Sequence, residues 1–442
     1  MVRTRFAPSP TGVLHIGGLR TALYAYALSK HEGGEFVLRI EDTDKKREVE
    51  GSKEKIKKIL TDYGLVWDKY FEQSKRVKEG VYKKAAETLV GQGYAFYCQC
   101  EAKNAKEGFS KELRDPCRDK KFISGAIKLR VPDNETISFH DFVLDKDISW
   151  DTNTIGDATL LKSDEYPTYH LAVVVDDTDM GITHMLRGHD WMPSTPIHLL
   201  IYKYLDLPVI QMGHLTDILD PEGGKLSKRK GSTSVEGLEQ DGYLKEALFN
   251  FVILLGWAPK NNQEIFTFQE FIDGFDIKGF QKSNPVFNRE KLDWFNGYYI
   301  RQKTDTELVE LLRKFTPENA SMDILLKVVS LIKDRIKKLS EFKEFAGFFF
   351  EEPQIDKSLF GQKYKDHLNL ALEVLEDIGD WDLELLNEKL MQKIKENEFK
   401  TGDFFMDLRI AITGNKFTPP INDSIIILGK ENSTKRVKKA LE

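Results

Sequence analysis

The first forty residues alternate between short apolar runs and turn-forming residues. Residues 2–6 are partly β-branched and predict a strand, and the prolines and glycine within 8–12 end it. Apolar side chains then recur at helical spacing over residues 16–30, and the apolar run 35–40 predicts a second strand. A strand–helix–strand unit of this kind opens a doubly wound parallel sheet, whose ligands bind beyond the carboxyl ends of the strands.

The hydrophobic pattern changes in the middle of the chain and again towards its end. Residues 78–172 combine one helical pattern with short strand-like pieces such as 126–131, which indicates an insertion. The apolar run 171–175 predicts a return to the sheet as a strand, with residues 182–187 as its neighbour. After about residue 305 helical spacing dominates, with one apolar stripe that predicts a packed core. The stripe consists of Leu325, Val328, Val329, Ile332, Ile336, Leu339 and Phe342.

These patterns predict an α/β protein: a Rossmann-like doubly wound catalytic domain with an α+β insertion, followed by an all-α domain. The length of 442 residues is enough for about three domains. We place the Rossmann-like domain at 1–77 and 173–218 and the insertion at 78–172. A segment with a basic loop follows at 219–304, and the helical domain occupies 305–442.

Charge and hydropathy exclude some classes of partner. The net charge is 65 − 71 = −6, which argues against indiscriminate DNA binding but leaves room for RNA on a locally basic surface. No apolar run approaches the roughly 20 residues that span a bilayer. The chain begins with a strand pattern rather than an apolar secretory segment. We therefore expect a soluble cytoplasmic protein with no DNA and no membrane as partner.

Two short stretches far apart in the chain carry the candidate chemistry. His15 precedes a predicted helix start, where backbone N–H groups and the helix dipole favour an anion. Lys225 and Lys228 lie in a glycine-bounded loop that could close over the phosphates of a nucleotide. Such cations would stabilise the charge that builds when a carboxylate attacks an α-phosphate. Singly, the motifs also fit a loop-end histidine and a basic surface loop, but together they favour adenylate chemistry.

The stretches around these residues resemble bacterial-type glutamyl-tRNA synthetases, which are class I aminoacyl-tRNA synthetases. The resemblance rests on RFAPSPTG with HIGG (5–18), RIEDTD (39–44), YPTYHLA with VVVDD (166–177), RGHDW with STP (187–196) and KLSKR (225–229). It implies an enzyme that makes glutamyl-adenylate from L-glutamate and Mg²⁺-bound ATP and transfers the glutamyl group to tRNA-Glu. It also implies an insertion at the acceptor end, a stem-contacting segment, a helical anticodon-binding domain, a monomer, and activation that requires bound tRNA. Whether tRNA-Gln is a second substrate stays open.

The resemblance also implies which residues handle ATP. The signature histidine is His15 and the lysines of the second signature are Lys225 and Lys228, which we take as the catalytic residues. Gly18 stands where many class I enzymes have a second histidine, so one side-chain contact to ATP is absent. His189 replaces the acid that the family usually has, which changes the expected geometry beside ATP. The full ATP set is His15, Gly17, Gly18, Asp190, Trp191, Lys225, Ser227, Lys228 and Arg229.

The glutamate site follows from the charges of the substrate as well as from the resemblance. Glutamate carries two carboxylates and one ammonium group, so its site calls for two cationic forks and one acid. Arg5 and Arg187 supply bidentate partners, and Glu41 supplies the acid. Tyr169 can donate to a carboxylate, and a guanidinium facing the neutral amide of glutamine would disfavour that amino acid. The alternative is a salt bridge between Arg5 and Glu41 at the strand ends. The resemblance assigns the same four residues together with Ala7 and Ser9.

The cysteines form a second candidate site. There are three of them, Cys98, Cys100 and Cys117, which is too few for a closed disulfide framework. Some members of the family hold zinc in this insertion with Cys-x-Cys and Cys-x-His, and here Asp119 stands in the place of the histidine. A structural Zn²⁺ on the three cysteines and Asp119 is one interpretation, and three free or buried thiols is the other.

Other functions share parts of this pattern. A tRNA-modifying paralogue lacks the helical domain, and the roughly 140 residues after 305 argue against it. A catalytically silent tRNA-binding relative would not need His15, Glu41 and the two loop lysines together. A nucleotidyltransferase would not need the paired arginines. Arg335, placed on the amphipathic helix, could contact an anticodon base, but we favour a solvated helix face as its explanation.

Overall fold

The computed structural model describes residues 1–100, 113–226 and 233–442. Within them the chain divides into two compact units. One consists of residues 1–238 and 249–288, and the other of residues 239–248 and 289–442. All ten described strands belong to the first unit, and the described residues of the second are helical or irregular.

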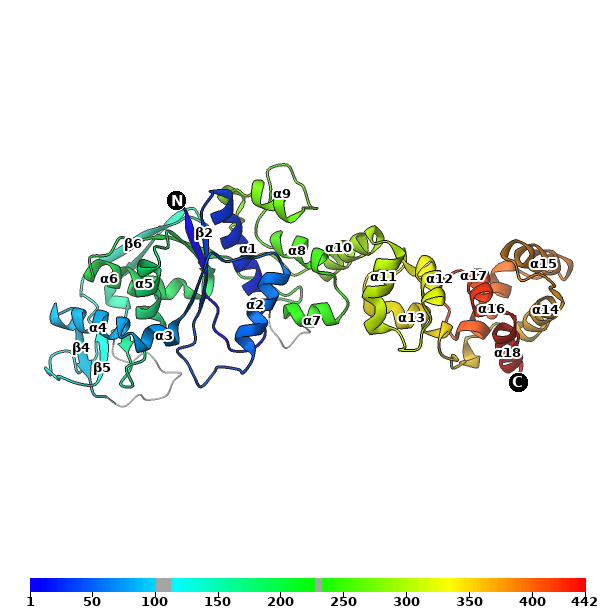
Figure 1. The fold of residues 1–442 in the computed structure, drawn as a ribbon, viewed down its shortest axis with the longest axis horizontal. Helices are drawn as coiled ribbons and strands as arrows, with labels where there is room; N and C mark the ends of the chain where they lie inside the picture. The colour runs from blue at the N-terminus through cyan, green and yellow to red at the C-terminus, as the bar shows by residue number, and fades with distance from the viewer. Residues whose placement is uncertain (101–112, 227–232) are drawn as a thin grey trace. The chain divides into compact units, whose positions relative to one another are not determined.

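A parallel sheet lies at the centre of the first unit (Figure 1). Three of its strands pair in the order β1-β2-β3, and β9 pairs with β10. The amide of Thr183 donates to the carbonyl of Arg3 at 2.9 Å, which brings β9 beside β1. The strands predicted at 2–6 and 35–40 are thereby confirmed. The five strands are β1 (Arg3–Phe6), β2 (Glu35–Ile40), β3 (Lys69–Glu72), β9 (His184–Gly188) and β10 (Gln211–Leu215).

Helix α1 (Ile16–His31) connects β1 to β2, as the spacing of its apolar residues predicts. Its side chains Leu19 and Leu23 are fully buried, because the helix packs against the sheet and against α9 (Phe268–Asp273). His15 is the N-cap residue, and Gly33 adopts a φ of +62° that turns the chain towards β2. The loop before α1 and the residues after β2 therefore meet at one end of the sheet.

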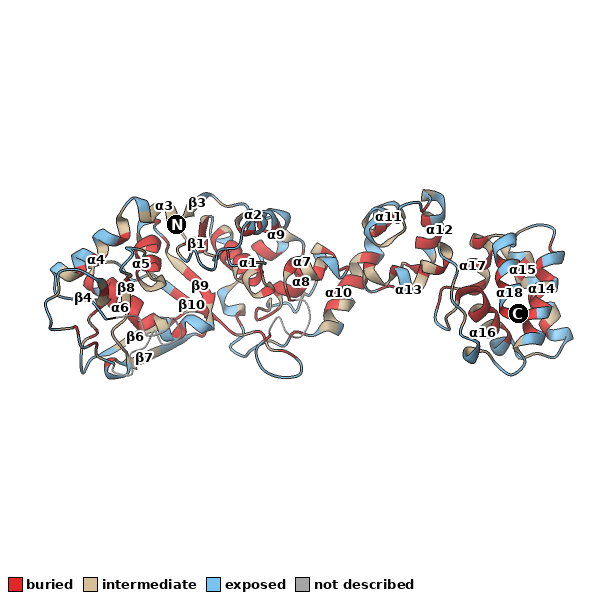
Figure 2. Cartoon of the chain, turned by 90° about the horizontal axis from the view of Figure 1, so that it is seen from below, coloured by how far each residue is buried: buried red, intermediate tan, exposed pale blue. Residues whose placement is uncertain are grey.

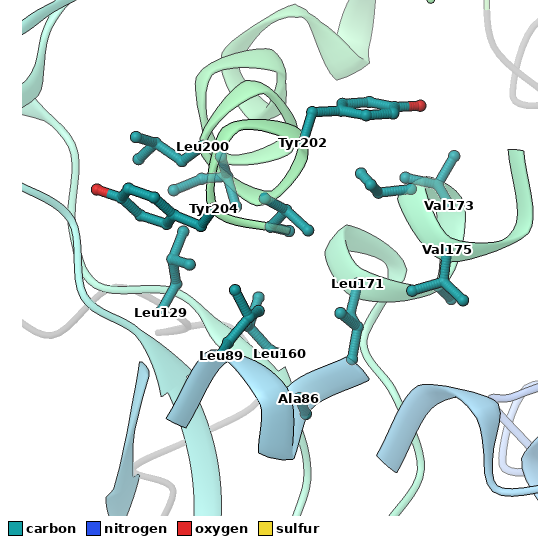
Figure 3. Close-up of a cluster of buried hydrophobic side chains, with 14 of the residues drawn as sticks. Ala86, Leu89, Leu129, Leu160, Leu171, Val173, Val175, Leu200, Tyr202 and Tyr204 are labelled. Atoms are coloured by element: carbon teal, nitrogen blue, oxygen red, sulfur yellow. The ribbon is translucent and has the colours of Figure 1, made fainter. Parts of the chain in front are cut away.

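The run 171–175 is helical, so the strand predicted there is wrong. It lies in α5 (Tyr169–Asp179), and the predicted boundary between residues 172 and 173 falls inside this helix. Figure 3 shows Val173 leaving α5 on a different side from Leu171 and Val175, and all three belong to one apolar cluster. Because α5 is surrounded by α4 (Val81–Gly91) and α6 (Thr195–Tyr204), it is apolar on most sides and has no clear helical period. A short apolar run of this kind cannot be told from a strand by pattern alone.

The predicted insertion contributes to two sheets. Its antiparallel sheet has the order β4-β5-β8, formed by β4 (Ala95–Cys98), β5 (Ala126–Leu129) and β8 (Thr159–Leu161). A hairpin of β6 (Thr136–Asp141) and β7 (Lys146–Asp151) instead extends the central sheet. Asp141 of β6 lies opposite Met212 of β10 in parallel register. The insertion therefore reaches the central sheet directly.

Four further helices belong to this part of the chain. They are α2 (Ser52–Asp62), α3 (Gln73–Lys78), α7 (Val235–Gln240) and α8 (Lys245–Ile253). Among the described helices, none combines the length and the apolar composition that crossing a bilayer requires.

The second unit is built from packed helices, with buried residues on their inner sides and exposed residues outside (Figure 2). All seven side chains of the predicted apolar stripe are buried. The helix that carries the stripe ends at Ile332, however, so Arg335 lies in a turn after it and not on a helix as predicted. The helices are α10 (Arg289–Gln302), α11 (Asp305–Leu312), α12 (Met322–Ile332), α13 (Phe342–Ala346), α14 (Tyr364–Asp377), α15 (Leu383–Glu396), α16 (Thr401–Thr413), α17 (Ile421–Leu428) and α18 (Lys430–Leu441).

Candidate active site

A cavity of about 230 Å³ opens at the carboxyl ends of β1 and β9. It brings together all six residues predicted for the glutamate site, namely Arg5, Ala7, Ser9, Glu41, Tyr169 and Arg187. Trp191, predicted for the ATP side, also lines it, and its ring lies 3.9 Å from that of Tyr169. The remaining lining residues are Phe6, Thr21, Leu186 and Gly188. The cavity thus has two guanidinium groups, one carboxyl group and a phenol on its walls.

A buried cluster of charges lies behind the cavity. Arg39 of β2 is fully buried and donates to Asp177 at 2.6 Å and to Glu41 at 3.2 Å. Its Nε also lies 3.6 Å from a carboxylate oxygen of Asp176. Burial alone would raise the pKa of Asp177, but Arg5 and Arg39 outweigh burial and lower it. Asp177, at the end of α5, therefore stays ionised and holds both arginines.

The sequence reading did not assign a role to this cluster. Its signal was an arginine in the middle of the apolar strand 35–40, because a buried guanidinium requires acids around it. The pair Asp176 and Asp177 after an apolar run was the matching signal.

Most N–H groups of Arg5 are not used in hydrogen bonds to the described residues. Its Nε donates to Asp177 at 3.2 Å, and its Nη1 donates to the carbonyl of Leu186 at 2.9 Å. Three of its five N–H groups have no acceptor among the described residues, because a guanidinium carries five. Arg5 can therefore offer a fork to a carboxylate, and it does not form the direct salt bridge with Glu41 that was the alternative prediction.

Glu41 is a carboxyl group with an unusual environment. Burial raises its pKa to about 6, although the nearby Arg39 and Arg5 act in the opposite direction. Its side chain is 10% exposed and lines the cavity. An ammonium group entering the cavity would find a carboxylate here above about pH 6 and a neutral acid below it.

Arg187 is buried among neutral groups. Its Nε donates to His214 at 2.9 Å, its Nη1 to Tyr169 at 3.3 Å and to His198 at 3.1 Å, and its Nη2 to Thr195 at 2.9 Å. Four of its five N–H groups are engaged, so one remains and the predicted fork is not available in this arrangement. No carboxylate of the described residues forms an ion pair with Arg187, which leaves a buried positive charge at the cavity wall.

The histidines around Arg187 are neutral. Burial lowers the pKa of His214 to about 4 and holds that of His198 well below its usual range, with the charge of Arg187 acting in the same direction. His170 extends this group of histidines: its Nδ1 lies 3.2 Å from Nε2 of His198. Burial likewise lowers the pKa of His170 to about 4. These side chains were not predicted, because nothing in their separate sequence positions shows that they converge on one arginine.

The structure describes six of the nine residues predicted for ATP, and one of them, Trp191, lines the cavity. His15 caps α1, and its Nδ1 accepts from the amide of Gly17 at 3.1 Å. A Cβ added at Gly18 would approach Leu14 to 2.7 Å, so a larger residue there would require Leu14 to move. Three of the predicted residues, Ser227, Lys228 and Arg229, lie outside the described residues.

Lys225 forms an ion pair with Asp190 and another with Asp217 at 2.9 Å. Burial would lower the pKa of Lys225, but the hydrogen bonds to the two carboxylates outweigh it and raise the pKa. Lys225 is therefore charged, and Asp190 links it to the end of β9. Asp217 was not predicted. Both Lys225 and Asp190 are more than half exposed, so they can exchange partners with a ligand.

The cysteines converge, but with a different acid from the one predicted. The three thiols and a carboxylate oxygen of Asp115 lie within 4.8 Å of one another. Sγ of Cys100 is 3.3 Å from that of Cys117, and Sγ of Cys98 is 3.5 Å from Asp115. Asp119 is instead 92% exposed and pairs with Arg130, so its assignment as the fourth ligand is wrong. Asp115 and Cys117 are buried, whereas Asp119 lies on the exposed side of the same turn.

Comparison with known proteins identifies the class. A family model described as tRNA synthetases class I (E and Q), catalytic domain, matches residues 1–294. A model described as anticodon binding domain matches residues 307–441. The parallel sheet and the cavity at its carboxyl edge agree with these matches, so the chain belongs to the class I tRNA synthetases for glutamate and glutamine.

Individual relatives narrow the class to one family. The glutamate–tRNA ligase of Finegoldia magna is 36% identical over the whole of this chain and 99% of its own length. That of Treponema denticola is 37% identical with the same coverage. A crystal structure of the glutamate–tRNA ligase of Elizabethkingia meningosepticum with its amino acid has a TM-score of 0.82, with 31% identity over all of this chain and 99% of that one. The chain is a member of the glutamate–tRNA ligase family.

Proposed function

We propose that the cavity at the carboxyl ends of β1 and β9 binds L-glutamate for ligation to tRNA. The observation that carries the proposal is the position of Arg187, a buried cation on the cavity wall without an acid partner among the described residues. A buried charge of this kind calls for a counterion, and a substrate carboxylate supplies one. Glutamine would leave the charge unpaired, so the cavity favours the acid over the amide.

Both arginines then bind the side-chain carboxylate of glutamate. The α-carboxylate must turn towards ATP to react, so the side-chain carboxylate is the group that remains against the guanidinium groups. Arg5 offers a fork, and Arg187 offers the one N–H group of Nη2 that its other bonds leave over. Glu41 receives the ammonium group, and Ala7 and Ser9 line the wall beside it. A carboxylate and two guanidinium groups fix the orientation of the substrate.

The reaction proceeds in two transfers. An α-carboxylate oxygen of glutamate attacks the α-phosphorus of ATP, the bond to pyrophosphate breaks, and glutamyl-adenylate forms. A terminal ribose hydroxyl of tRNA then attacks the acyl carbon, and AMP leaves with the electron pair of the mixed anhydride. His15, with Nδ1 occupied by Gly17, presents the proton of Nε2 to a phosphate, and Lys225 supplies positive charge once it exchanges Asp190 for the nucleotide. Mg²⁺, bound with ATP, neutralises the outer phosphates.

A structural zinc site in the insertion is part of the proposal. Tetrahedral Zn–S bonds of about 2.3 Å separate neighbouring sulfurs by about 3.8 Å. Three thiols and one carboxylate within 4.8 Å of one another fit that spacing. Cys98, Cys100, Cys117 and Asp115 would hold the ion, which would join the end of β4 to the turn before β5. The alternative is a set of metal-free thiols.

The nucleic-acid partner is tRNA, bound in part by the helices that match the anticodon-binding family. We propose tRNA-Glu as the substrate and a cytoplasmic monomer as the working form. Whether tRNA-Gln is also charged depends on base contacts that the catalytic cavity does not contain.

Aminoacylation with labelled glutamate, run separately on tRNA-Glu and tRNA-Gln transcripts, tests the function. We expect tRNA-Glu to be charged. Charging of both transcripts would retain the proposed chemistry and define an enzyme that also serves tRNA-Gln. Folded, ATP-binding protein that charges neither transcript would overturn the proposal and favour a silent or tRNA-modifying relative.

A further inference from the structure

Arg187 is held by a pair of residues that no part of the proposed reaction uses. His214 of β10 and Asp141 of β6 are both completely buried, and Nδ1 of His214 lies 2.7 Å from Oδ2 of Asp141. On the other side of the ring, Nε2 of His214 accepts from Nε of Arg187 at 2.9 Å. The three side chains form a line from the insertion hairpin to the wall of the cavity.

We propose that Asp141 and His214 are positioning residues that fix Arg187 for recognition of the substrate carboxylate. The proposal rests on the assignment of Arg187 to glutamate binding given above. Asp141 acts through His214, and neither residue touches the substrate.

The carboxylate of Asp141 determines the tautomer of His214. An ionised carboxylate only accepts hydrogen bonds, so the ring proton sits on Nδ1. Nε2 is then an acceptor, which is what the Nε–H of Arg187 requires. Burial would raise the pKa of Asp141, but the bonds from His214 and Leu144 outweigh it and lower the pKa, so the carboxylate persists. Its other acceptor positions receive the amides of Val143 and Leu144 at 3.0 and 2.9 Å.

A neutral acceptor at this position serves recognition better than an acid would. A carboxylate in direct contact with Arg187 would compensate its charge and compete with the substrate. His214 instead satisfies the N–H group and leaves the positive charge in place, because burial keeps the imidazole neutral. Thr195, which accepts from Nη2 at 2.9 Å, and His198 do the same at the other edges of the guanidinium. The arginine is thus fixed in orientation and uncompensated in charge.

Replacement of Asp141 by asparagine tests the proposal. The side-chain amide of Asp141→Asn would donate to Nδ1 of His214, which moves the ring proton to Nε2 and sets it against the Nε–H of Arg187. Loss of one buried charged hydrogen bond predicts a rise in the KM for glutamate of about tenfold or more, with kcat within about threefold of the wild type. The preference for glutamate over glutamine should fall with it.

The chain contains a matched control for the loss of a buried His–Asp bond. In the helical unit, Nδ1 of His367 lies 2.7 Å from Oδ2 of Asp407, and both side chains are buried. Asp407→Asn breaks a bond of the same length without an arginine beside it. We expect it to lower the Tm and leave the KM for glutamate unchanged. An equal rise in KM from both variants would overturn the proposal, since it would show a general effect of destabilisation.

Two further comparisons separate positioning from folding. In an Arg187→Gln background, Asp141→Asn should add less than about twofold to the KM, because its effect passes through the missing arginine. If the two effects multiply fully, the proposal is wrong. His214→Gln keeps an acceptor near the position of Nε2, so its KM for glutamate should stay close to that of the wild type. His214→Asn removes this acceptor, so its KM should rise. This second pair decides the matter should Asp141→Asn fail to fold.

Failure of the proposal is distinct from failure of the proposed function. A wild-type protein that charges tRNA with glutamate, together with an Asp141→Asn variant of unchanged KM, would refute the positioning role alone. A folded wild-type protein that does not charge tRNA would refute the glutamate assignment itself.

Discussion

At the scale of single residues, Arg5 has three N–H groups that face no acceptor among the described residues, whereas Arg187 has one. Arg5→Ala should raise the KM for glutamate about 100-fold, because it removes about 3 kcal/mol of charged hydrogen bonding. Steady-state aminoacylation measures this. Arg3→Ala, on the same strand and paired with Glu35 outside the cavity, is the control and should leave the KM unchanged. An unchanged KM in the Arg5 variant would count against its assignment.

The raised pKa of Glu41 predicts a pH dependence. The sign follows from the shift: a pKa of about 6 means that Glu41 is ionised above pH 6 and neutral below it. The groups facing it are Arg39, Arg5, Asp177 and Tyr169. The shifted pKa values keep Arg39 and Asp177 charged and Tyr169 neutral over this pH range. The kcat/KM for glutamate should therefore fall about tenfold per pH unit below about pH 6.

Glu41→Gln is the matching variant for this titration. Its kcat/KM should be low and flat over the same pH range, because the amide does not ionise. The same pH profile in the variant and the wild type would assign the titration to another group.

The residues that line the cavity were predictable, and those behind them were not. Arg5, Glu41, Tyr169 and Arg187 could be named because a glutamate site calls for their charges and donors, and all four line the cavity. Asp141 and His214 are 73 positions apart, and their pairing depends on a strand of the insertion lying beside β10. No local pattern in the sequence indicates that these two strands are neighbours. The sequence alone therefore could not predict an acid behind Arg187.

At the scale of elements, the start of α1 combines two roles in His15. The imidazole accepts from the amide of Gly17 as the N-cap, and the proposed reaction assigns its other nitrogen to a phosphate. His15→Asn separates the roles, because asparagine is a good N-cap and lacks the second donor. Turnover should fall about 100-fold while the free energy of unfolding changes by less than about 0.5 kcal/mol. Near-normal turnover in this variant would remove His15 from the catalytic set.

The cysteine cluster joins the end of β4 to the turn before β5, so its metal content affects that sheet. Metal analysis of the purified protein should find one zinc per chain. Cys117→Ser and Asp115→Ala should lower the zinc content and the Tm, whereas Asp119→Ala, on the exposed side of the turn, should change neither. Absence of zinc, with three thiols reacting in the unfolded protein, would favour the metal-free alternative.

The elements show where pattern reading works. α1 and β2 were predictable because turn-forming residues separate the elements: Pro8, Pro10 and Gly12 precede α1, and Gly33 and Gly34 stand between α1 and β2. α5 was not, because a helix buried on most sides has the composition of a central strand. The end of α12 at Ile332 was missed for a related reason: the apolar stripe continues through a turn and a short 3-10 helix, where the burial persists after the helical geometry stops.

At the scale of the whole molecule, the catalytic and anticodon-binding family models match separate parts of one chain, residues 1–294 and 307–441. The family resemblance implies that tRNA must be bound before glutamate is activated. Exchange of labelled pyrophosphate into ATP should therefore require tRNA as well as glutamate. Full exchange without tRNA would refute this dependence, and exchange in neither condition would point to an inactive preparation, which aminoacylation would reveal.

The pairing of β6 with β10 has a consequence for chimaeric proteins. Asp141 comes from the hairpin of the insertion and His214 from the central sheet. The insertion therefore could not be replaced by that of a relative without affecting this pair. A graft from a relative would have to preserve the alignment of Asp141 with Met212 as well as the loop lengths at its ends. A one-residue slip in the pairing of β6 with β10 would turn the carboxylate of Asp141 to the other face of the sheet. A graft of the insertion, which is expected to contact RNA, would then also alter the selection of the amino acid.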